Sequence, residues 1–259
     1  TKAISHRGPD EENFYIESNI HLGFRRLSII DIKNGSQPMK SNNGNQILCF
    51  NGEIYNYKSL KEILISKGIN LKTSSDTEVL LEAFSFWGIR CLDYLRGMFS
   101  FIIYERNKNK LTLVRDRLGI KPLFYTIKNK ILYFSSEIKS LIDSNEISLE
   151  VNNSAISSYL TFRYPIGSGT FFKNIHEVNP GEIIEFYDNK ITAKKYWTIP
   201  IKKKQEEDLG EDYYLNDTIN LLQDTCKVHL ESDVPISGLL SGGLDSSIIM
   251  SIINNIRNK

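Results

Sequence analysis

Ser241-Gly242-Gly243-Leu244-Asp245-Ser246-Ser247 is the stretch of this 259-residue chain that says most about its fold. It separates two short apolar runs, 234–240 and 248–256, and this order predicts a strand, a tight loop and a helix. Adjacent glycines let backbone N–H groups converge, and the positive end of the following helix points at the loop. Such a loop suits phosphate oxygens. It is not a Walker A loop, because no lysine follows the glycines. A glycine turn capped by serines is the plainer alternative.

The composition is that of a globular protein with balanced charge. Hydrophobic residues make up 41% of the chain. The charges of 32 basic residues nearly cancel those of 31 acidic ones, so the net charge does not indicate a protein that binds nucleic acid or a membrane surface. Three widely spaced cysteines fit neither a disulfide framework nor a zinc site. No apolar run approaches about 18 residues, and there is no signal-peptide pattern. We therefore expect one or two domains in the reducing cytoplasm.

The ends of the chain suggest a fragment. It opens on Thr1 and stops at Lys259, one predicted helix after the phosphate loop. A phosphate loop between a strand and a helix normally belongs to a parallel sheet, which needs further strand–helix units. We expect a chain truncated at both ends.

Residues before 201 alternate short β-like runs with turns and a few helical stretches. Hairpin-length connections dominate, which favours an α+β fold with mostly antiparallel strands. The predicted strands are 46–50, 99–104, 111–115, 123–126, 131–135, 181–187 and 191–197, and the predicted helices are 57–67, 76–87, 136–144 and 153–160.

A charged run marks the predicted domain boundary. Residues 202–212 contain one apolar residue among charges, so we assign them to a linker between a first domain (1–201) and the start of a second (213–259). Beyond the linker, Leu215, Ile219, Leu222 and Cys226 have amphipathic helical spacing and predict a helix that leads into the phosphate-loop strand.

Four short motifs in the first domain carry polar residues that could form a site. Each has a structural explanation when taken alone, since Asn-Gly is a common hairpin turn and Asp76 could simply cap a helix. The motifs are His6-Arg7-Gly8-Pro9-Asp10, Arg25-Arg26-Leu27-Ser28-Ile29-Ile30-Asp31, Asn51-Gly52-Glu53-Ile54-Tyr55-Asn56 and Ser75-Asp76-Thr77-Glu78.

Together, in this order, the four motifs resemble the glutaminase domain of class II glutamine amidotransferases. The Ser241–Ser247 loop resembles the pyrophosphate loop of enzymes that cleave ATP to AMP. The four motifs and this loop together resemble the glutamine-hydrolysing asparagine synthetase family. Residues 115–123 and 233–235 resemble other signatures of that family. The resemblance implies an N-terminal-nucleophile-type α/β/β/α sandwich, followed by the first strand, loop and helix of an ATP-pyrophosphatase domain.

The resemblance also implies a glutamine site. Arg26 matches the arginine that binds the α-carboxylate, and a guanidinium offers a bidentate fork for this. Asn51 and Gly52 match the oxyanion hole, and Glu53 and Asp76 match the carboxylates that hold the α-ammonium. The implied glutamine-binding residues are Arg26, Leu27, Ser28, Ile29, Ile30, Asn51, Gly52, Glu53 and Asp76, with Leu27–Ile30 expected on one strand.

In the second domain the resemblance implies an ATP site that uses Mg²⁺. Asp245 would lie near the Mg²⁺–pyrophosphate, because the metal needs a fixed anionic ligand. The implied ATP-binding residues are Leu239, Leu240, Ser241, Gly242, Gly243, Leu244, Asp245 and Ser246.

The family nucleophile is an N-terminal cysteine, and none occurs upstream of His6 in this sequence. Cys49, Cys91 and Cys226 lie in or beside predicted apolar elements and are expected to be buried structural thiols. We expect the polypeptide 1–259 by itself not to hydrolyse glutamine.

The function implied for the whole protein is glutamine- and ATP-dependent synthesis of an amide, with aspartate converted to asparagine. Its partners would be small molecules, and it could form a homodimer. An amidotransferase of the same family that acts on a cell-surface sugar or peptide is one alternative. Another is a degenerate paralogue that binds glutamine or nucleotide without catalysis. A glutaminase joined to a sugar-isomerase or phosphoribosyl-transfer domain is a third, and the Ser241–Ser247 loop counts against it.

Overall fold

The computed structural model describes residues 1–201 and 208–257. The chain divides into two compact units, Thr1–Thr198 and Ile199–Lys259. None of the described helices is both long enough and apolar enough to cross a membrane.

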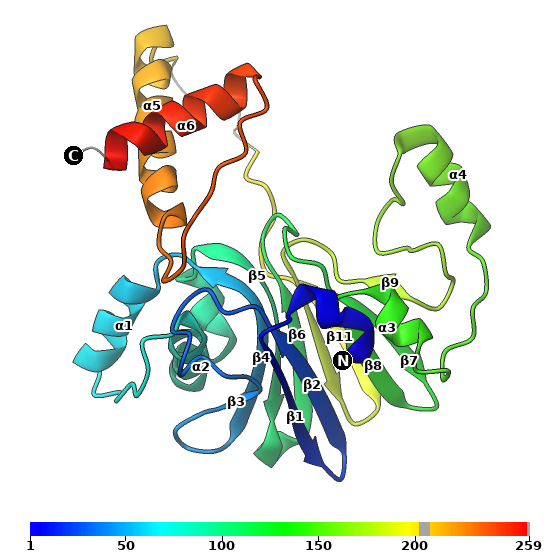
Figure 1. Ribbon diagram of the computed structural model, residues 1–259. Helices are drawn as coiled ribbons and strands as arrows, with labels where there is room; N and C mark the ends of the chain where they lie inside the picture. The colour runs from blue at the N-terminus through cyan, green and yellow to red at the C-terminus, as the bar shows by residue number, and fades with distance from the viewer. Residues whose placement is uncertain (202–207, 258–259) are drawn as a thin grey trace. The chain divides into compact units, whose positions relative to one another are not determined.

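A six-stranded antiparallel sheet forms the centre of the first unit (Figure 1). Its longest strands, β4 and β5, pair along their whole length, from Gln46 opposite Glu105 to Ile54 opposite Gly97. The strands are, in spatial order, β11 (Lys190–Lys195), β10 (Glu182–Tyr187), β6 (Lys110–Arg115), β5 (Gly97–Glu105), β4 (Gln46–Ile54) and β3 (Met39–Lys40).

Helices cover one face of this sheet. Side chains alternate between the two faces of a strand, so Phe99, Phe101 and Ile103 of β5 all point to the same side. There they pack against α1 (Tyr57–Ser66) and α2 (Asp76–Trp87) in one buried cluster. The short helix η2 (Gly88–Asp93) follows α2 on the same side.

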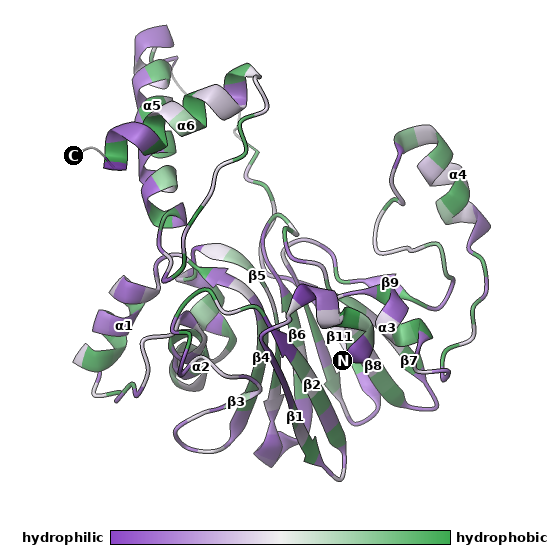
Figure 2. Ribbon diagram, in the orientation of Figure 1, coloured by the Kyte–Doolittle hydropathy of each residue, from purple (hydrophilic) through white to green (hydrophobic). Residues whose placement is uncertain are grey.

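Two smaller sheets cover the opposite face. One is the hairpin of β1 (Glu11–Glu17) and β2 (Ile20–Arg26), and the other contains β8 (Ile131–Ser135), β7 (Phe124–Lys128) and β9 (His176–Glu177). Figure 2 shows hydrophobic residues at alternate positions of β2. One of them, Leu22, is buried against Ile102 of β5 and its neighbours.

A second helical layer lies outside these small sheets. Helix α3 (Ile138–Ile142) contacts β8 and the N-terminal turn η1 (Lys2–Arg7). The unit also contains the turn η3 (Arg106–Lys108) and helix α4 (Asn153–Phe162). Helices, sheet, sheet and helices follow one another, which is the α/β/β/α order that the sequence analysis predicts.

All seven predicted strands and all four predicted helices of this unit are present, with ends that shift by a few residues. The hairpin β1–β2 was not predicted. The strand expected at Leu27–Ile30 is wrong, because β2 ends at Arg26 and a loop follows. Asn51 and Gly52 lie within β4, so they do not form a hairpin turn.

The second unit consists of two helices in its described part. Helix α5 (Glu211–His229) includes the predicted amphipathic stretch and takes in the last two residues of the predicted linker, of which 202–207 lie outside the described residues. The helix predicted at 248–256 is present as α6 (Leu244–Arg257), which begins earlier, within the glycine loop. The strand predicted at 234–240 is wrong. In the described part of this unit no neighbouring strand supplies hydrogen bonds, and Leu239 is 94% exposed.

Residues 115–123, which resemble a family signature, form a turn that is held together by hydrogen bonds to the side chain of Asp116. This residue is only 1% exposed. Its carboxylate accepts hydrogen bonds from the backbone N–H groups of Leu118, Ile120 and Lys121 at 3.0 Å and of Phe99 at 3.2 Å. One buried charge therefore fixes the turn after β6 to strand β5.

Replacing Asp116 with alanine should lower the free energy of unfolding by roughly 3 kcal/mol or more, because four backbone donors would lose their acceptor. Urea unfolding of Asp116→Ala measures the loss. Asp143→Ala is the matched control, since Asp143 is exposed after α3 and should change stability by less than about 0.5 kcal/mol. Equal losses of stability in the two variants would contradict the stabilising role of the hydrogen bonds to Asp116.

Candidate functional site

A cavity of about 900 Å³ opens in the first unit, and residues from most of the predicted glutamine site line it. The predicted site residues in its wall are Arg26, Leu27, Ile29, Ile30, Asn51, Gly52, Glu53 and Asp76. Ser28 does not line the cavity; its backbone N–H donates to Asp10 at 2.8 Å. The structure thus brings together residues that lie up to fifty positions apart.

Asn51 places an unused donor in this wall. Its Nδ2 atom is buried and has no hydrogen-bond partner within the described part of the chain. Buried polar groups are nearly always paired, so an unpaired one calls for an explanation. An amide N–H that awaits an oxygen from a ligand is such an explanation.

Gly52 lies at a point where the backbones of β4 and β5 approach closely. Its φ angle is +152°, and a Cβ added there would lie 2.1 Å from the Met98 carbonyl oxygen. Any side chain would push β4 away from β5. Glycine is therefore required for the strand to run past Met98.

The direction of the Gly52 N–H follows from its neighbours. The backbone N–H and C=O of Phe99, which is opposite Gly52, both bond to Asp116. Gly52 and Phe99 are thus a pair without mutual hydrogen bonds, and the Gly52 N–H points away from β5. No strand among the described residues covers β4 on that side beyond Leu48. A second donor therefore lies on an open edge, directly beside Asn51.

Two carboxylates, Glu53 and Asp76, lie in the same wall and form no ion pair in the described part of the chain. Burial raises the pKa of Asp76 to about 6, and the charge of Glu53 adds to the rise against a hydrogen bond from Ile54 N–H at 3.0 Å. Burial also raises the pKa of Glu53, and the charge of Lys121 offsets part of that rise. Neither carboxylate forms an ion pair within residues 1–201 and 208–257. This end of the cavity would favour a cation.

Helix α2 holds Asp76 in place. Ser75 caps the helix by accepting a hydrogen bond from Glu78 N–H at 3.2 Å. The Glu78 carboxylate accepts further bonds from the backbone of Lys72 and Thr73. Asp76 is thus fixed at the first turn of a well-capped helix.

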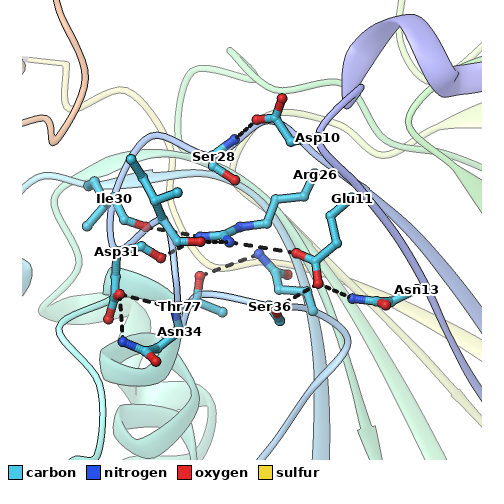
Figure 3. A network of polar contacts seen from close by, with 12 residues as sticks. Asp10, Glu11, Asn13, Arg26, Ser28, Ile30, Asp31, Asn34, Ser36 and Thr77 are labelled. Atoms are coloured by element: carbon cyan, nitrogen blue, oxygen red, sulfur yellow. Dashed lines mark hydrogen bonds and ion pairs between the residues drawn. The ribbon is translucent and has the colours of Figure 1, made fainter.

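Arg26 is buried and faces the loop that follows β2 (Figure 3). Its guanidinium donates to the carbonyl oxygens of Ile30, Asp31 and Ile32 at 2.8–3.2 Å, and Glu11 lies 3.7 Å away. Most of its N–H groups are therefore engaged with the loop. It is less available for a bidentate clamp than the sequence suggests, although its charge lies at the cavity.

The loop is also tied to α2. The Asp31 carboxylate accepts bonds from Asn34 and from the backbone N–H of Ser74 (2.8 Å), just before the cap of α2. Burial opposes ionisation of Asp31, but these hydrogen bonds and the Arg26 charge bring its pKa below the usual value. Arg26 and Asp31 together fix the loop that forms one wall of the cavity.

None of the three cysteines is a plausible nucleophile. Cys49 lines the cavity but is buried, and burial raises its pKa to about 12. Burial raises the pKa of Cys91 to about 12 as well, and that of Cys226 in the same direction. These thiols stay protonated near neutral pH, and a thiol reacts as its thiolate.

Gln37, Thr77 and Lys121 are among the residues of the cavity wall that the sequence analysis did not assign to the site. Lys121 belongs to a run noticed only as a family signature. Gln37 stands before Pro38 in a stretch with no periodic pattern, so no sequence signal identified it.

The predicted ATP-binding residues lie in an exposed loop and helix start of the second unit. Gly242 has a φ of +83°, which favours glycine, and the Ser246 and Ser247 hydroxyls donate to the Gly243 carbonyl. Asp245 is exposed at the first turn of α6. The described residues contain no group of three or more His, Cys, Asp or Glu that could hold a metal ion.

Comparison with known proteins identifies the family. The family model of the glutamine amidotransferase domain matches residues 1–197, which are three quarters of the chain. The chain belongs to the glutamine amidotransferase domain family. Residues 218–259 match the asparagine synthase family model. Both halves of the resemblance seen in the sequence are thereby confirmed.

Two relatives of the amidotransferase come from Bacillus subtilis. Asparagine synthetase [glutamine-hydrolyzing] 1 is 41% identical over 251 residues, which are 96% of this chain and 39% of the relative. Asparagine synthetase [glutamine-hydrolyzing] 2 is 39% identical, over 95% of this chain and 34% of the relative. The chain thus spans less than two fifths of the length of these curated relatives.

A solved structure of the allosteric regulatory enzyme of purine biosynthesis shares the fold. It is 19% identical, with a TM-score of 0.51 over 90% of this chain and 49% of that chain. The N-terminal-nucleophile-type sandwich expected from the sequence is confirmed for the amidotransferase domain.

The buried charge of Asp76 should cost stability. Its folded-state pKa, about 6, lies above its ordinary value of 3.8, so the folded protein binds this proton more tightly than the unfolded chain does. Stability should fall as the pH rises from 4 to 6. We expect Asp76→Asn to raise the free energy of unfolding by about 1–3 kcal/mol at pH 8, with no gain near pH 4.

Urea unfolding between pH 4 and 8 measures this difference. Glu78→Gln is the control in the same helical turn, because the Glu78 carboxylate accepts several hydrogen bonds and its replacement should destabilise the fold at pH 8. If Asp76→Asn lost as much stability at pH 8 as Glu78→Gln, the prediction that the buried charge of Asp76 destabilises the fold would be contradicted.

Proposed function

We propose that the protein containing this chain hydrolyses glutamine in the first unit and uses the ammonia, with ATP, to convert aspartate into asparagine. The observation that carries the proposal is the cavity wall in which the unpaired Nδ2 of Asn51 and the open-edge N–H of Gly52 lie beside two carboxylates that form no ion pair within the described residues. The wall offers complementary groups for both ends of a free amino acid that carries an amide.

The two donors would act on the side-chain amide of glutamine. When a nucleophile attacks the amide carbon, negative charge develops on its oxygen, and fixed N–H donors stabilise that charge without having to reorganise. Asn51 and Gly52 supply one side-chain donor and one backbone donor. The attacking thiol is not one of Cys49, Cys91 and Cys226, whose raised pKa values keep them protonated.

Glu53 and Asp76 would bind the α-ammonium group of glutamine. A bound cation would lower both raised pKa values, so the cost of burying the carboxylates is offset only in the complex. At the other end, Arg26 would attract the α-carboxylate by its charge, and the loop Leu27–Ile30 would complete the wall. The two charged ends would fix which way glutamine lies.

In the second unit the loop Leu239–Ser246 would hold ATP, and the match to the asparagine synthase family supports this. The exposed Asp245 carboxylate at the start of α6 fits a ligand for Mg²⁺, which proteins often bind through one or two carboxylates plus substrate phosphates. Mg²⁺ would neutralise the charge of the departing pyrophosphate. We further propose that the enzyme acts in the cytoplasm, on small molecules and as a possible homodimer; its free, buried cysteines fit a reducing compartment.

Asn51→Ala tests the first site in the full-length protein. We expect the kcat for glutamate release to fall about 100- to 1000-fold, the usual effect of losing one oxyanion donor, while AMP formation with ammonia stays unchanged. Asn45→Ala is the control, since Asn45 bonds to the Asn107 backbone beyond the far end of β4. An unchanged rate of glutamate release in Asn51→Ala would overturn the proposed site.

Asp245→Asn tests the second site. The amide keeps the shape and loses the charge, so AMP formation should stop with either glutamine or ammonia as nitrogen source, while glutamate release continues. Asp217→Asn on the exposed surface of α5 is the control. AMP formed at the normal rate by Asp245→Asn would refute its role, and AMP formed in the absence of aspartate would point to another acceptor.

A further inference from the structure

Gln37 makes an unusual set of contacts with the main chain of β4. It is 6% exposed, and its Oε1 atom accepts a hydrogen bond from Phe50 N–H at 2.6 Å. Its Nε2 atom donates to the Phe50 carbonyl at 3.1 Å and to the Thr77 hydroxyl at 3.4 Å. A single side-chain amide thus satisfies both main-chain groups of one strand residue, as a neighbouring strand normally does.

The strand register explains why Gln37 occupies this position. Strand β3 pairs Met39 with Leu48 and Lys40 with Ile47. Continuing this register by two residues places Gln37 opposite Phe50. Alternate residues of a strand direct their main-chain groups to the same edge, so Pro38, in between, faces away from β4 and the next rung would come from Gln37. The side chain of Gln37 therefore replaces a main-chain rung at the point where strand pairing ends.

This substitute rung lies next to the proposed oxyanion donors. Main-chain groups two residues apart in a strand face the same edge, so the N–H of Gly52 faces the edge that Gln37 covers at Phe50. Asn51 lies between the two. Motion of β4 at Phe50 would move both donors together.

The same side chain reaches the cation-binding end of the cavity. Thr77 follows Asp76 in the first turn of α2, and both residues line the cavity together with Gln37. The amide of Gln37 is thereby bonded to the strand that carries the oxyanion donors and to the helix that carries the ammonium-binding carboxylate.

We propose that Gln37 is a positioning residue for glutamine hydrolysis. It fixes the distance between the oxyanion donors on β4 and the Asp76 carboxylate on α2, so that a bound glutamine reaches both. The inference rests on the proposed function, and it adds to that function a residue that aligns the two halves of the site.

Gln37→Met tests it in the full-length protein, because methionine has a similar length but no hydrogen-bonding amide. The kcat for glutamate release should fall about tenfold, which corresponds to the loss of one or two net hydrogen bonds. The KM for glutamine should change less, since Glu53 and Asp76 are retained. AMP formation with ammonia should stay within about twofold of the wild type, because the second unit is untouched.

Gln46→Met is the matched control. Gln46 is on β4, the strand that Gln37 contacts; it is 7% exposed and bonds through its amide to Ser41 and Ser85 away from the cavity. Both variants should lose stability in urea, but only Gln37→Met should lose kcat. Amide hydrogen exchange at Phe50 should also become faster in Gln37→Met alone.

A charge variant gives an independent readout. The Gln37→Glu carboxylate can accept from Phe50 N–H but cannot donate to the Phe50 carbonyl until it is protonated. Its kcat relative to wild type at each pH should therefore recover as the pH is lowered from 8 toward 5.5. A merely structural role would give a ratio that does not depend on pH.

The outcomes separate the two proposals. Wild-type protein that releases no glutamate from glutamine would overturn the proposed function and this inference together. Active wild type with an unchanged kcat in Gln37→Met, or an equal loss in Gln46→Met, would overturn the role of Gln37 alone. Unchanged exchange at Phe50 would also overturn it.

Discussion

Strand β4 is hydrogen-bonded to β5 along one edge from Gln46 to Ile54, but on its other edge the pairing with β3 stops at Leu48. Beyond that point the open edge of β4 has main-chain groups without a strand partner. An open edge is usually a liability, because its N–H groups are free to bind another chain. Here the edge lies in a cavity wall, where the same free N–H can bind a substrate oxygen. The location of the site follows from this interruption of the sheet.

The electrostatics of the cavity follow the same logic. Asp76 is buried and Glu53 is half-buried, both with raised pKa values, and the folded protein gains nothing from their ionisation. Asp31 and Asp116, buried in the same domain, are instead surrounded by backbone donors. The two pairs show that the fold can stabilise buried carboxylates with hydrogen bonds. Glu53 and Asp76 form no ion pair among the described residues, and the proposed binding of an ammonium group requires such an unmet interaction before the ligand arrives.

How much could be predicted depended on whether a feature is local. Helix α2 was predicted to begin at Asp76 and end at Trp87, because a serine cap and a 3.6-residue apolar repeat are read from adjacent residues. Its site residue Asp76 came with it. The strand at 234–240 was wrong although its composition is apolar, since a strand needs a partner that composition does not reveal. The strand at Leu27–Ile30 was wrong as well: Arg26 donates to the carbonyl of Ile30 and to that of Asp31, just beyond this segment, and so holds the chain as a loop.

The proposed oxyanion donors, Asn51 and Gly52, show the limit of sequence reasoning most clearly. Their identity was suggested by a motif, yet Asn51-Gly52 in isolation predicts a hairpin turn, and in the protein it lies within a strand. The role proposed for Gly52 depends on the direction of one N–H. That direction is set by Asp116, which takes the main-chain groups of Phe99 on one side, and by Gln37, which takes those of Phe50 on the other. These residues come from positions 37, 50, 99 and 116, and only the folded sheet brings their hydrogen bonds into register. The sequence can supply the chemical groups of such a site, but the main-chain directions that make them converge are a property of the pairing pattern.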